Sequence, residues 1–231
     1  MEQKSDSGGA GKEKTADAAE QLQMPGKNAT QESKKQQIKR YQTILLDPPW
    51  RHQQLGNYGA VNHYQLMSLE KIKAMPIADL ADDNAHIWLW TTNATTEPAY
   101  EILRAWGFTP RSVFYWIKPG LGLGVYLRNC VEACILATRG KAPVMFRSQP
   151  NWGFFPRQDH SHKPEEVHKI IERVSPGPNR LELFARRPFS GWDVWGNEVR
   201  SDIDIPGYPV PDSPETRKLA LLKEQDGSGN E

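Results

Sequence analysis

Short apolar runs rich in β-branched and aromatic residues recur along the middle of the chain and predict buried strands. They occupy residues 43–47, 86–91, 112–118, 131–138, 180–186 and, as a shorter run, 192–195. Residues that start or stop helices lie between some of these runs: Ser68 as an N-cap, Gly107 after a last turn and Pro164 in a first turn. The predicted helices cover residues 69–74, 96–106 and 164–174. This alternation predicts a three-layer α/β sheet, in which ligands bind at the carboxyl ends of the strands.

The two ends of the chain differ in composition from its middle. Residues 1–37 are rich in Lys, Glu, Gln, Gly, Ala and Ser and hold almost no large apolar side chains, which predicts a disordered, charged tail. Residues 205–231 carry four prolines and then a charged stretch, which predicts a flexible tail. Residues 38–204 remain, and their number suits a single domain.

Neither a membrane nor a resident metal ion is expected as a partner. No apolar run reaches transmembrane length, and the N-terminus lacks the apolar region of a signal peptide. The two cysteines, Cys130 and Cys134, lack zinc-site spacing and are too few for a disulfide framework. We therefore expect a cytoplasmic protein whose thiols are free.

The tetrapeptide Asp47-Pro48-Pro49-Trp50 ends the first apolar run and places a carboxylate at the edge of the predicted sheet. Neither proline can donate a backbone hydrogen bond and both have a fixed φ, so we expect a rigid turn with free carbonyl oxygens. Together with the flat ring of Trp50, these acceptors suit a planar group that carries an NH2, such as adenine. The same four residues are also typical of a Pro-Pro turn beside a core tryptophan.

Such a pocket would favour attack by the adenine amine on an activated methyl group. The amino nitrogen is a poor nucleophile because its lone pair is delocalised into the ring. Two acceptors on its N–H bonds favour a more tetrahedral nitrogen and stabilise the positive charge that develops during attack. Holding the nitrogen in line with the methyl group would supply much of the remaining acceleration.

The tetrapeptide resembles the D-P-P-W signature of the MT-A70 family of adenine-N6 methyltransferases. Further family motifs follow in order: Ser161-His162-Lys163-Pro164, Ile170-Ile171-Glu172-Arg173, Leu181-Glu182-Leu183-Phe184-Ala185-Arg186 and Gly196-Asn197-Glu198. The resemblance covers residues 41–200, and free-standing members of this kind are typical of bacteria and their phages. It implies a Rossmann-like methyltransferase sheet and S-adenosyl-L-methionine as methyl donor. It also implies a permuted, β-class-like motif order, in which the catalytic motif precedes the cofactor strand.

The resemblance also implies a cofactor site around Ser161, His162 and Lys163. Lys163 directly precedes a predicted helix, where a cation beside free amide groups suits the carboxylate of the methionine part. A solvated lysine at a helix start is the alternative interpretation, and His162 could equally be a capping or packing residue.

The later motifs add four candidate cofactor residues. Glu182 is an acid inside an apolar strand, so it should have either an ion-pair partner or a ligand. Arg186 is a candidate for the ribose hydroxyls or the methionine carboxylate. Asn197 and Glu198 resemble the adenosine-binding pair of the family. RNA-modifying members usually carry an amide where this chain has Glu198, and a carboxylate cannot donate a hydrogen bond.

Residues 111–163 carry eight basic side chains and only two acidic ones. The basic residues are Arg111, Lys118, Arg128, Arg139, Lys141, Arg147, Arg157 and Lys163. Eight aromatic residues lie among them, and at least half of these are expected in the core: Phe114, Tyr115, Trp116, Tyr126, Phe146, Trp152, Phe154 and Phe155. Basic residues interleaved with aromatic ones suit phosphate contacts and base stacking, so we expect this segment to bind nucleic acid.

Three residues are expected to contact the substrate: Lys118 in this segment, and Tyr64 and Glu132 by resemblance to the family's adenine pocket. The loop around Tyr64, residues 51–66, is expected to close over the substrate. The chain lacks an appended RNA-binding module, which favours DNA over RNA and a site-specific enzyme. Methylation of RNA, a non-catalytic nucleic-acid-binding subunit and a small-molecule methyltransferase are the alternatives. A homodimer is possible, and a bacterial enzyme of this kind would be associated with the nucleoid.

Overall fold

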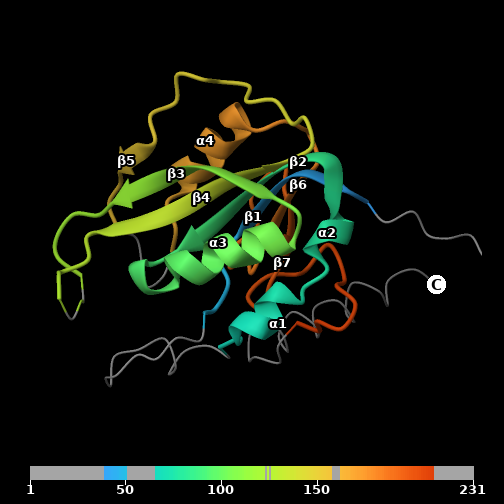
Figure 1. Cartoon of the computed structure of the whole chain (residues 1–231), viewed down its shortest axis with the longest axis horizontal. Helices are drawn as coiled ribbons and strands as arrows, with labels where there is room; N and C mark the ends of the chain where they lie inside the picture. Colours follow the sequence, from blue (N-terminus) through green and yellow to red (C-terminus); the bar gives the residue numbers. More distant parts are fainter. Residues whose placement is uncertain (1–38, 51–65, 123, 125, 158–161, 211–231) are drawn as a thin grey trace, which may run out of the picture. The chain divides into compact units, whose positions relative to one another are not determined.

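The computed structural model describes residues 39–50, 66–122, 124, 126–157 and 162–210. Their strands form one seven-stranded mixed sheet in the order β5-β3-β4-β2-β1-β6-β7 (Figure 1). The strands are β1 (Tyr41–Leu46), β2 (Ala81–Thr91), β3 (Thr109–Ile117), β4 (Val131–Arg139), β5 (Trp152–Phe154), β6 (Arg180–Leu183) and β7 (Asp193–Trp195). Only β4 pairs antiparallel with its neighbours, so the other strands all end at the same edge of the sheet.

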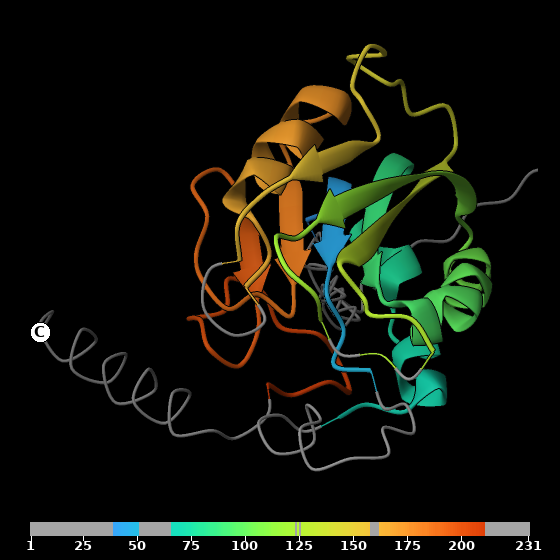
Figure 2. The same cartoon turned by 90° about the vertical axis from the view of Figure 1, so that its left-hand side faces the viewer.

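Successive residues of a strand point to opposite faces of the sheet. Because both sets are apolar here, helices pack on both faces. Ile44 and Leu46 of β1 belong to a core with α1 (Leu69–Lys73), α2 (Ile77–Leu80) and α3 (Thr96–Ala105). Leu45 points the other way, into a core with Trp88, Trp90 and α4 (Glu165–Val174). Figure 2 shows α4 and the other helices on opposite sides of the strands. The α/β fold class is therefore confirmed.

Most predicted elements are present, and the differences have local causes. Ser68 caps α1 by accepting a hydrogen bond from the Lys71 amide. The elements α2, β5 and the 3-10 helix η2 (Asn93–Thr95) were not predicted, because three or four residues are too few to establish a period. The strand predicted over residues 180–186 ends at Leu183, because Phe184 adopts a positive φ of 63° that turns the chain.

The packed part of the chain continues beyond residue 204, where we expected the domain to end. Ile205 is buried in the core beneath α1 and α2. The Tyr208 hydroxyl donates a hydrogen bond to the Lys71 carbonyl at 2.9 Å. The predicted tail of residues 1–37 and residues 211–231 lie outside the described residues.

The cysteines are free thiols, and Cys134 is buried within β4. Burial raises the pKa of the Cys134 thiol, and the nearby Asp47 carboxylate acts in the same direction, so this thiol stays protonated. In the described part of the chain no helix is long and apolar enough to cross a membrane.

One buried polar cluster ties β2 to the end of α4. His86 is fully buried, and its Nδ1 lies 3.0 Å from the Ser175 hydroxyl, which also accepts a hydrogen bond from the Trp88 indole at 2.8 Å. The other ring nitrogen lies 3.4 Å from the Ala142 carbonyl. Burial lowers the pKa of His86 below its ordinary 6.5, against a smaller opposing effect of the Ala142 carbonyl.

This pKa shift makes folding stability depend on pH. Below pH 6.5 the unfolded chain protonates His86 more readily than the folded chain does, so stability falls as pH falls through that range. Urea unfolding between pH 7.5 and 5.5 should therefore show a declining free energy of unfolding. The variant His86→Gln should show a shallower decline, and a slope equal to that of the wild type would contradict this account.

Candidate active site

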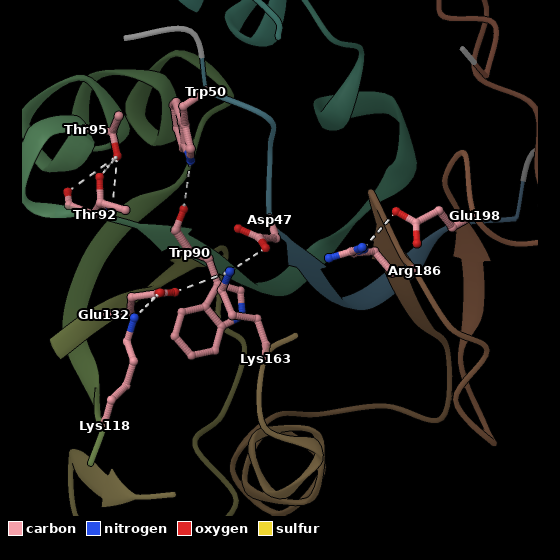
Figure 3. A network of polar contacts seen from close by, with 10 residues as sticks. All are labelled: Asp47, Trp50, Trp90, Thr92, Thr95, Lys118, Glu132, Lys163, Arg186 and Glu198. Carbon is pink, nitrogen blue, oxygen red and sulfur yellow. Dashed lines mark hydrogen bonds and ion pairs between the residues drawn. The ribbon is translucent and has the colours of Figure 1, made fainter. Parts of the chain in front are cut away.

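The carboxyl edge of the sheet gathers the predicted site residues. Asp47 directly follows β1, and Arg186 and Asn197 follow β6 and β7. Because β4 runs in the opposite direction, its second residue Glu132 lies at the same edge. Lys163 reaches this edge from the turn before α4 (Figure 3). The prediction that the strand ends carry the site is thus supported by the arrangement.

Four charged side chains form a continuous chain of ion pairs at this edge. Lys163 Nζ lies 2.5 Å from Asp47 Oδ2 and 3.3 Å from Glu132 Oε2. The other oxygen of Glu132 accepts a hydrogen bond from Lys118 (Figure 3). Signs alternate along Lys118, Glu132, Lys163 and Asp47, so each inner charge is flanked by two opposite ones.

These contacts fix the charge state of the cluster. Burial would favour a neutral Lys163, but Asp47 and Glu132 together outweigh it and raise its pKa above the usual range. Burial alone would also raise the pKa of Glu132, yet Lys163 and Lys118 hold it below its usual value. For Asp47 the burial effect prevails over the opposing effect of Lys163, and its pKa is raised. Asp47 is therefore the carboxylate of this cluster that most readily accepts a proton.

Trp90 and Trp50 connect the cluster to the core. The Lys163 ammonium lies 5.4 Å from the centroid of the Trp90 ring, close enough for a cation–π contact. The Trp50 indole donates a hydrogen bond to the Trp90 carbonyl at 3.3 Å. Trp50 is only 9% exposed and packs in the core, so it matches the alternative interpretation of a core tryptophan rather than an open stacking face.

The two prolines of the tetrapeptide also differ from expectation. Their carbonyl oxygens are not free: Pro48 accepts a hydrogen bond from the Trp50 amide at 2.9 Å, and Pro49 accepts one from the Met67 amide at 2.8 Å. These bonds fold the turn back against the chain that precedes α1. The prolines therefore stiffen the base of the site, and the Asp47 carboxylate is the exposed acceptor there.

A small open cleft adjoins Asp47 on the side of β6. It is lined by Asp47, His162, Lys163, Glu165, His168, Glu182, Phe184, Arg186, Arg187, Pro188 and Phe189. Its charged walls are held by internal pairs. Arg186 donates to Glu198 at 2.8 Å, and the Arg187 guanidinium lies 3.1 Å from His162 Nδ1. Cationic and anionic side chains thus surround this cleft.

Glu182 has the partner that its buried position predicted. Its carboxylate lies 2.8 Å from His168 Nε2 of α4. The His168 ring stacks on Phe189 at a centroid distance of 4.2 Å and meets the edge of Trp192. The aromatic rings of Phe189 and Trp192 therefore pack against the histidine that holds Glu182.

The backbone between β6 and Arg186 is tightly constrained. Phe184 holds a left-handed conformation that few non-glycine residues adopt, and such strain concentrates at functional sites. Beside it, a side chain at Gly196 would come within 2.1 Å of the Ala185 carbonyl, so only glycine fits there. This close approach places Arg186 next to Asn197 and Glu198.

Sequence reasoning missed several residues of this site. Trp90 was assigned only to a buried strand, and His168 only to a helix. A histidine about one turn into a helix that starts at the site was the available signal for His168. Arg187, Pro188 and Phe189 directly follow the Arg186 motif, and their place in the cleft could have been inferred from that proximity.

Some predicted residues are not brought to the site. Tyr64 and Ser161, and residues 51–65 of the expected closing loop, lie outside the described residues. Two of the basic residues expected to bind nucleic acid lie at the opposite edge of the sheet. Arg139 donates to the Ala78 carbonyl at 2.7 Å, and the Lys141 amide donates to Asn84 at 2.6 Å, both beside the start of β2. The segment 111–163 is therefore not one continuous basic surface. Because β4 runs antiparallel to β2, the residues at the end of β4 lie at the edge of the sheet opposite Asp47.

The expectation that at least half of the aromatic residues of this segment are core is also wrong. Phe114 and Trp116 are buried, and Phe155 is partly buried. The other five are each at least 38% exposed: Tyr115, Tyr126, Phe146, Trp152 and Phe154. Among the described residues, no group of three or more His, Cys, Asp or Glu side chains could hold a metal ion.

Comparison with known proteins identifies the family of this chain. The MT-A70 family model matches residues 41–198. The chain is 28% identical over 191 residues to the type II methyltransferase M.MunI of a Mycoplasma species, a match that covers 73% of this chain and 82% of that enzyme. It is 30% identical over 182 residues to the mouse N(6)-adenine-specific methyltransferase METTL4, covering 70% of this chain and 38% of that protein.

A further relative is the human N(6)-adenosine-methyltransferase catalytic subunit METTL3, which is 27% identical over 174 residues. That match covers 69% of this chain and only 28% of the human protein. The chain belongs to the MT-A70 family of adenine-N6 methyltransferases, and its α/β sheet is the Rossmann-like sheet expected for the family.

The charge of Asp47 is open to a direct test. Asp47→Asn keeps the size of the side chain, but it removes the negative charge and the ion pair with Lys163. We expect methyl transfer to fall at least about 100-fold, because an acceptor for the developing positive charge is lost. Turnover is measured with labelled cofactor, and circular dichroism checks the fold. Turnover within a few-fold of the wild type would show that this carboxylate is not needed.

The contact between Lys163 and Asp47 predicts a shift in pH dependence. Lys163 opposes the burial effect on Asp47, so Lys163→Met should raise the pKa of Asp47 further. Since activity needs the charged carboxylate, the acid limb of the kcat–pH profile should move to higher pH, by about one unit or more. The assay uses saturating cofactor and substrate. The exposed Lys169 on α4 supplies the control variant Lys169→Met, and a shift of equal size in both variants would contradict the prediction.

Proposed function

We propose that this chain transfers a methyl group from S-adenosyl-L-methionine to the N6 amine of adenine in DNA, with Asp47 as the acceptor for that amine. The observation that carries the proposal is the partly buried Asp47–Lys163 ion pair at the mouth of a cleft on the carboxyl edge of the sheet. The family supports the reaction class, and the cluster around Asp47 supports this edge of the sheet as its proposed site.

The cleft suits S-adenosyl-L-methionine in the chemistry of its walls. Arg186, Arg187 and Lys163 would receive the methionine carboxylate, and Glu182 would receive the amino group or ribose hydroxyls. Phe184 and Phe189 offer apolar surface to the adenine ring. Asn197, His162, Ser161 and Glu198 complete the proposed cofactor residues, with Glu198 held by Arg186.

When bound, the cofactor supplies an electrophilic methyl group on a positively charged sulfur. Asp47 would accept a hydrogen bond from the target amine and stabilise the positive charge that grows on the nitrogen. Its raised pKa also suits it to take the proton that the nitrogen must lose afterwards. Pro48, Pro49 and Trp50 would act indirectly, by keeping the backbone that carries Asp47 in place.

Glu132 and Lys118 lie on the other side of Asp47, where the target base would enter. Glu132 would offer a second acceptor to the amine, and Lys118 holds that carboxylate in place. Lys118 also lies over the Trp116 ring, 4.9 Å from its centroid, which limits its movement. Tyr64 remains a proposed substrate residue from the family resemblance.

Two observations favour DNA over RNA. The chain is similar to M.MunI, a type II methyltransferase, over 73% of its own length. Glu198 also replaces the amide that is usual in RNA-modifying members. RNA remains the second candidate, because METTL3 is named for adenosine. A homodimer and association with a bacterial nucleoid in the cytoplasm are parts of the same proposal.

The choice between substrates has a direct test. The protein is incubated with labelled S-adenosyl-L-methionine and with DNA and RNA oligonucleotides of matched sequence, and the digested nucleosides are resolved by mass spectrometry. We expect N6-methyldeoxyadenosine from DNA and little label from RNA. Asp47→Asn, measured in parallel, controls for a contaminating activity. Label in RNA alone would overturn the DNA assignment, and label in neither would overturn the proposed reaction for these polymers.

A further inference from the structure

The carboxyl half of the outer strands presents a continuous apolar face that we call the outer face. It consists of Tyr115, Ile117, Val131, Ala133, Trp152 and Phe154. Tyr115 pairs with Trp152 and Ala133, and Ile117 pairs with Phe154 and Val131. Residues that pair directly across strands point to the same side of a sheet, so these six side chains are neighbours on one surface.

This face is open in the structure, unlike the opposite side of the same strands. Trp152 is 54% exposed, Phe154 is 60% exposed and Tyr115 is 41% exposed. Phe114 and Trp116, which point the other way, are 3% exposed and pack with the residues of α4. On the side of the outer face, α3 buries Ala99, Ile102 and Leu103 over the inner strands. In Figure 1 the tips of β3 and β5 lie at the left of the view, away from α3.

Exposed arginines follow both outer strands in the sequence. Arg128 and Arg157 are exposed beside the carboxyl ends of β3 and β5. Between residues 111 and 157 the only acidic side chain is Glu132, and it is already bound by Lys118 and Lys163. An apolar face with exposed arginines close by in the sequence complements a polyanion. A second copy of the chain would bring like charges together at this surface.

Exposed rings on a flat sheet, with arginines beside them, are suited to stacking on unpaired bases. Bases inside a duplex already stack on one another and cannot use such a surface. Adenine N6 also lies on the base-pairing edge, so the target must leave the stack before it can be methylated. A strand that is open around the target would have neighbouring bases free to stack.

We propose that the outer face binds unpaired nucleotides that flank the target adenine, with Trp152, Phe154 and Tyr115 as stacking rings. The proposal rests on the proposed function, because it extends the nucleic-acid site from the carboxyl edge of the sheet onto β3 and β5. These strands end at the same edge as β1, and Lys118 directly follows β3. The substrate class is therefore single-stranded or locally opened nucleic acid.

The test compares oligonucleotide affinities of full-length variants by fluorescence anisotropy, with single-stranded and duplex DNA of the same sequence. Each stacked base contributes roughly 1–3 kcal/mol, so the double variant Trp152→Ala/Phe154→Ala should bind single-stranded DNA at least about tenfold more weakly. Duplex binding should change much less. S-adenosyl-L-methionine binding, measured by calorimetry, should equal that of the wild type, because the cleft lies on the other side of Asp47.

Two control variants separate stacking from other causes. Phe146→Ala removes an exposed ring that contacts Arg173 near the end of α4, at the opposite edge of the sheet, and should leave affinity unchanged. The double variant Trp152→Leu/Phe154→Leu keeps an apolar surface without rings, and should bind as weakly as the alanine variant. The conservative variant Trp152→Phe should retain most of the affinity.

Three results would overturn the proposal. The first is unchanged single-stranded affinity in the alanine variant. The second is an equal loss in Phe146→Ala. The third is a variant that changes from dimer to monomer by light scattering with its DNA affinity intact, which would assign the face to a second subunit. If the wild-type protein methylates DNA and the alanine variant still binds DNA normally, the proposal for the outer face is wrong but the proposed function stands. If no nucleic acid is methylated, the proposed function fails whatever these affinities show.

Discussion

The position of one ammonium group between two carboxylates governs the chemistry of this protein. Lys163 brings together three segments that are distant in sequence: the end of β1, the start of β4 and the turn before α4. Without that cation, two acids would meet in a poorly solvated place, and at least one would be neutral. The cation allows Glu132 to stay charged, whereas burial still raises the pKa of Asp47.

The cluster also explains why its acids differ although they share one lysine. Glu132 has a second cation, Lys118, whereas Asp47 is also near the negative charges of Glu132 and Glu182. The surroundings therefore keep Glu132 charged, whereas they make Asp47 the acid that can take up a proton. The same contrast underlies many acid–base sites built from residues of one type.

The fold and part of the site could be predicted from the sequence, and particular residues show why the rest could not. The run before Asp47 has a clear apolar pattern, so β1 and its acid were identified from local information. The neighbours of Lys163 depend on sheet order, and only the antiparallel placement of β4 makes Glu132 one of them. The antiparallel direction of β4 also places Arg139 and Lys141 at the edge of the sheet opposite the site. Whether the Trp50 ring faces a cleft or the core depends on packing, which its neighbours in sequence do not reveal.

The antiparallel hairpin of β3 and β4 has a consequence for how the chain can vary. Lys118 and Glu132 stand at its base, on either side of the connection, and the Lys118 amide donates a hydrogen bond to the Cys130 carbonyl at 2.7 Å. This backbone hydrogen bond thus holds the two strands together at the point where the connection between them begins. The connection beyond it can lengthen, shorten or change composition without altering the distance between these two side chains. Substrate preference could therefore diverge at the tip of the hairpin while the electrostatic balance around Lys163 is inherited unchanged.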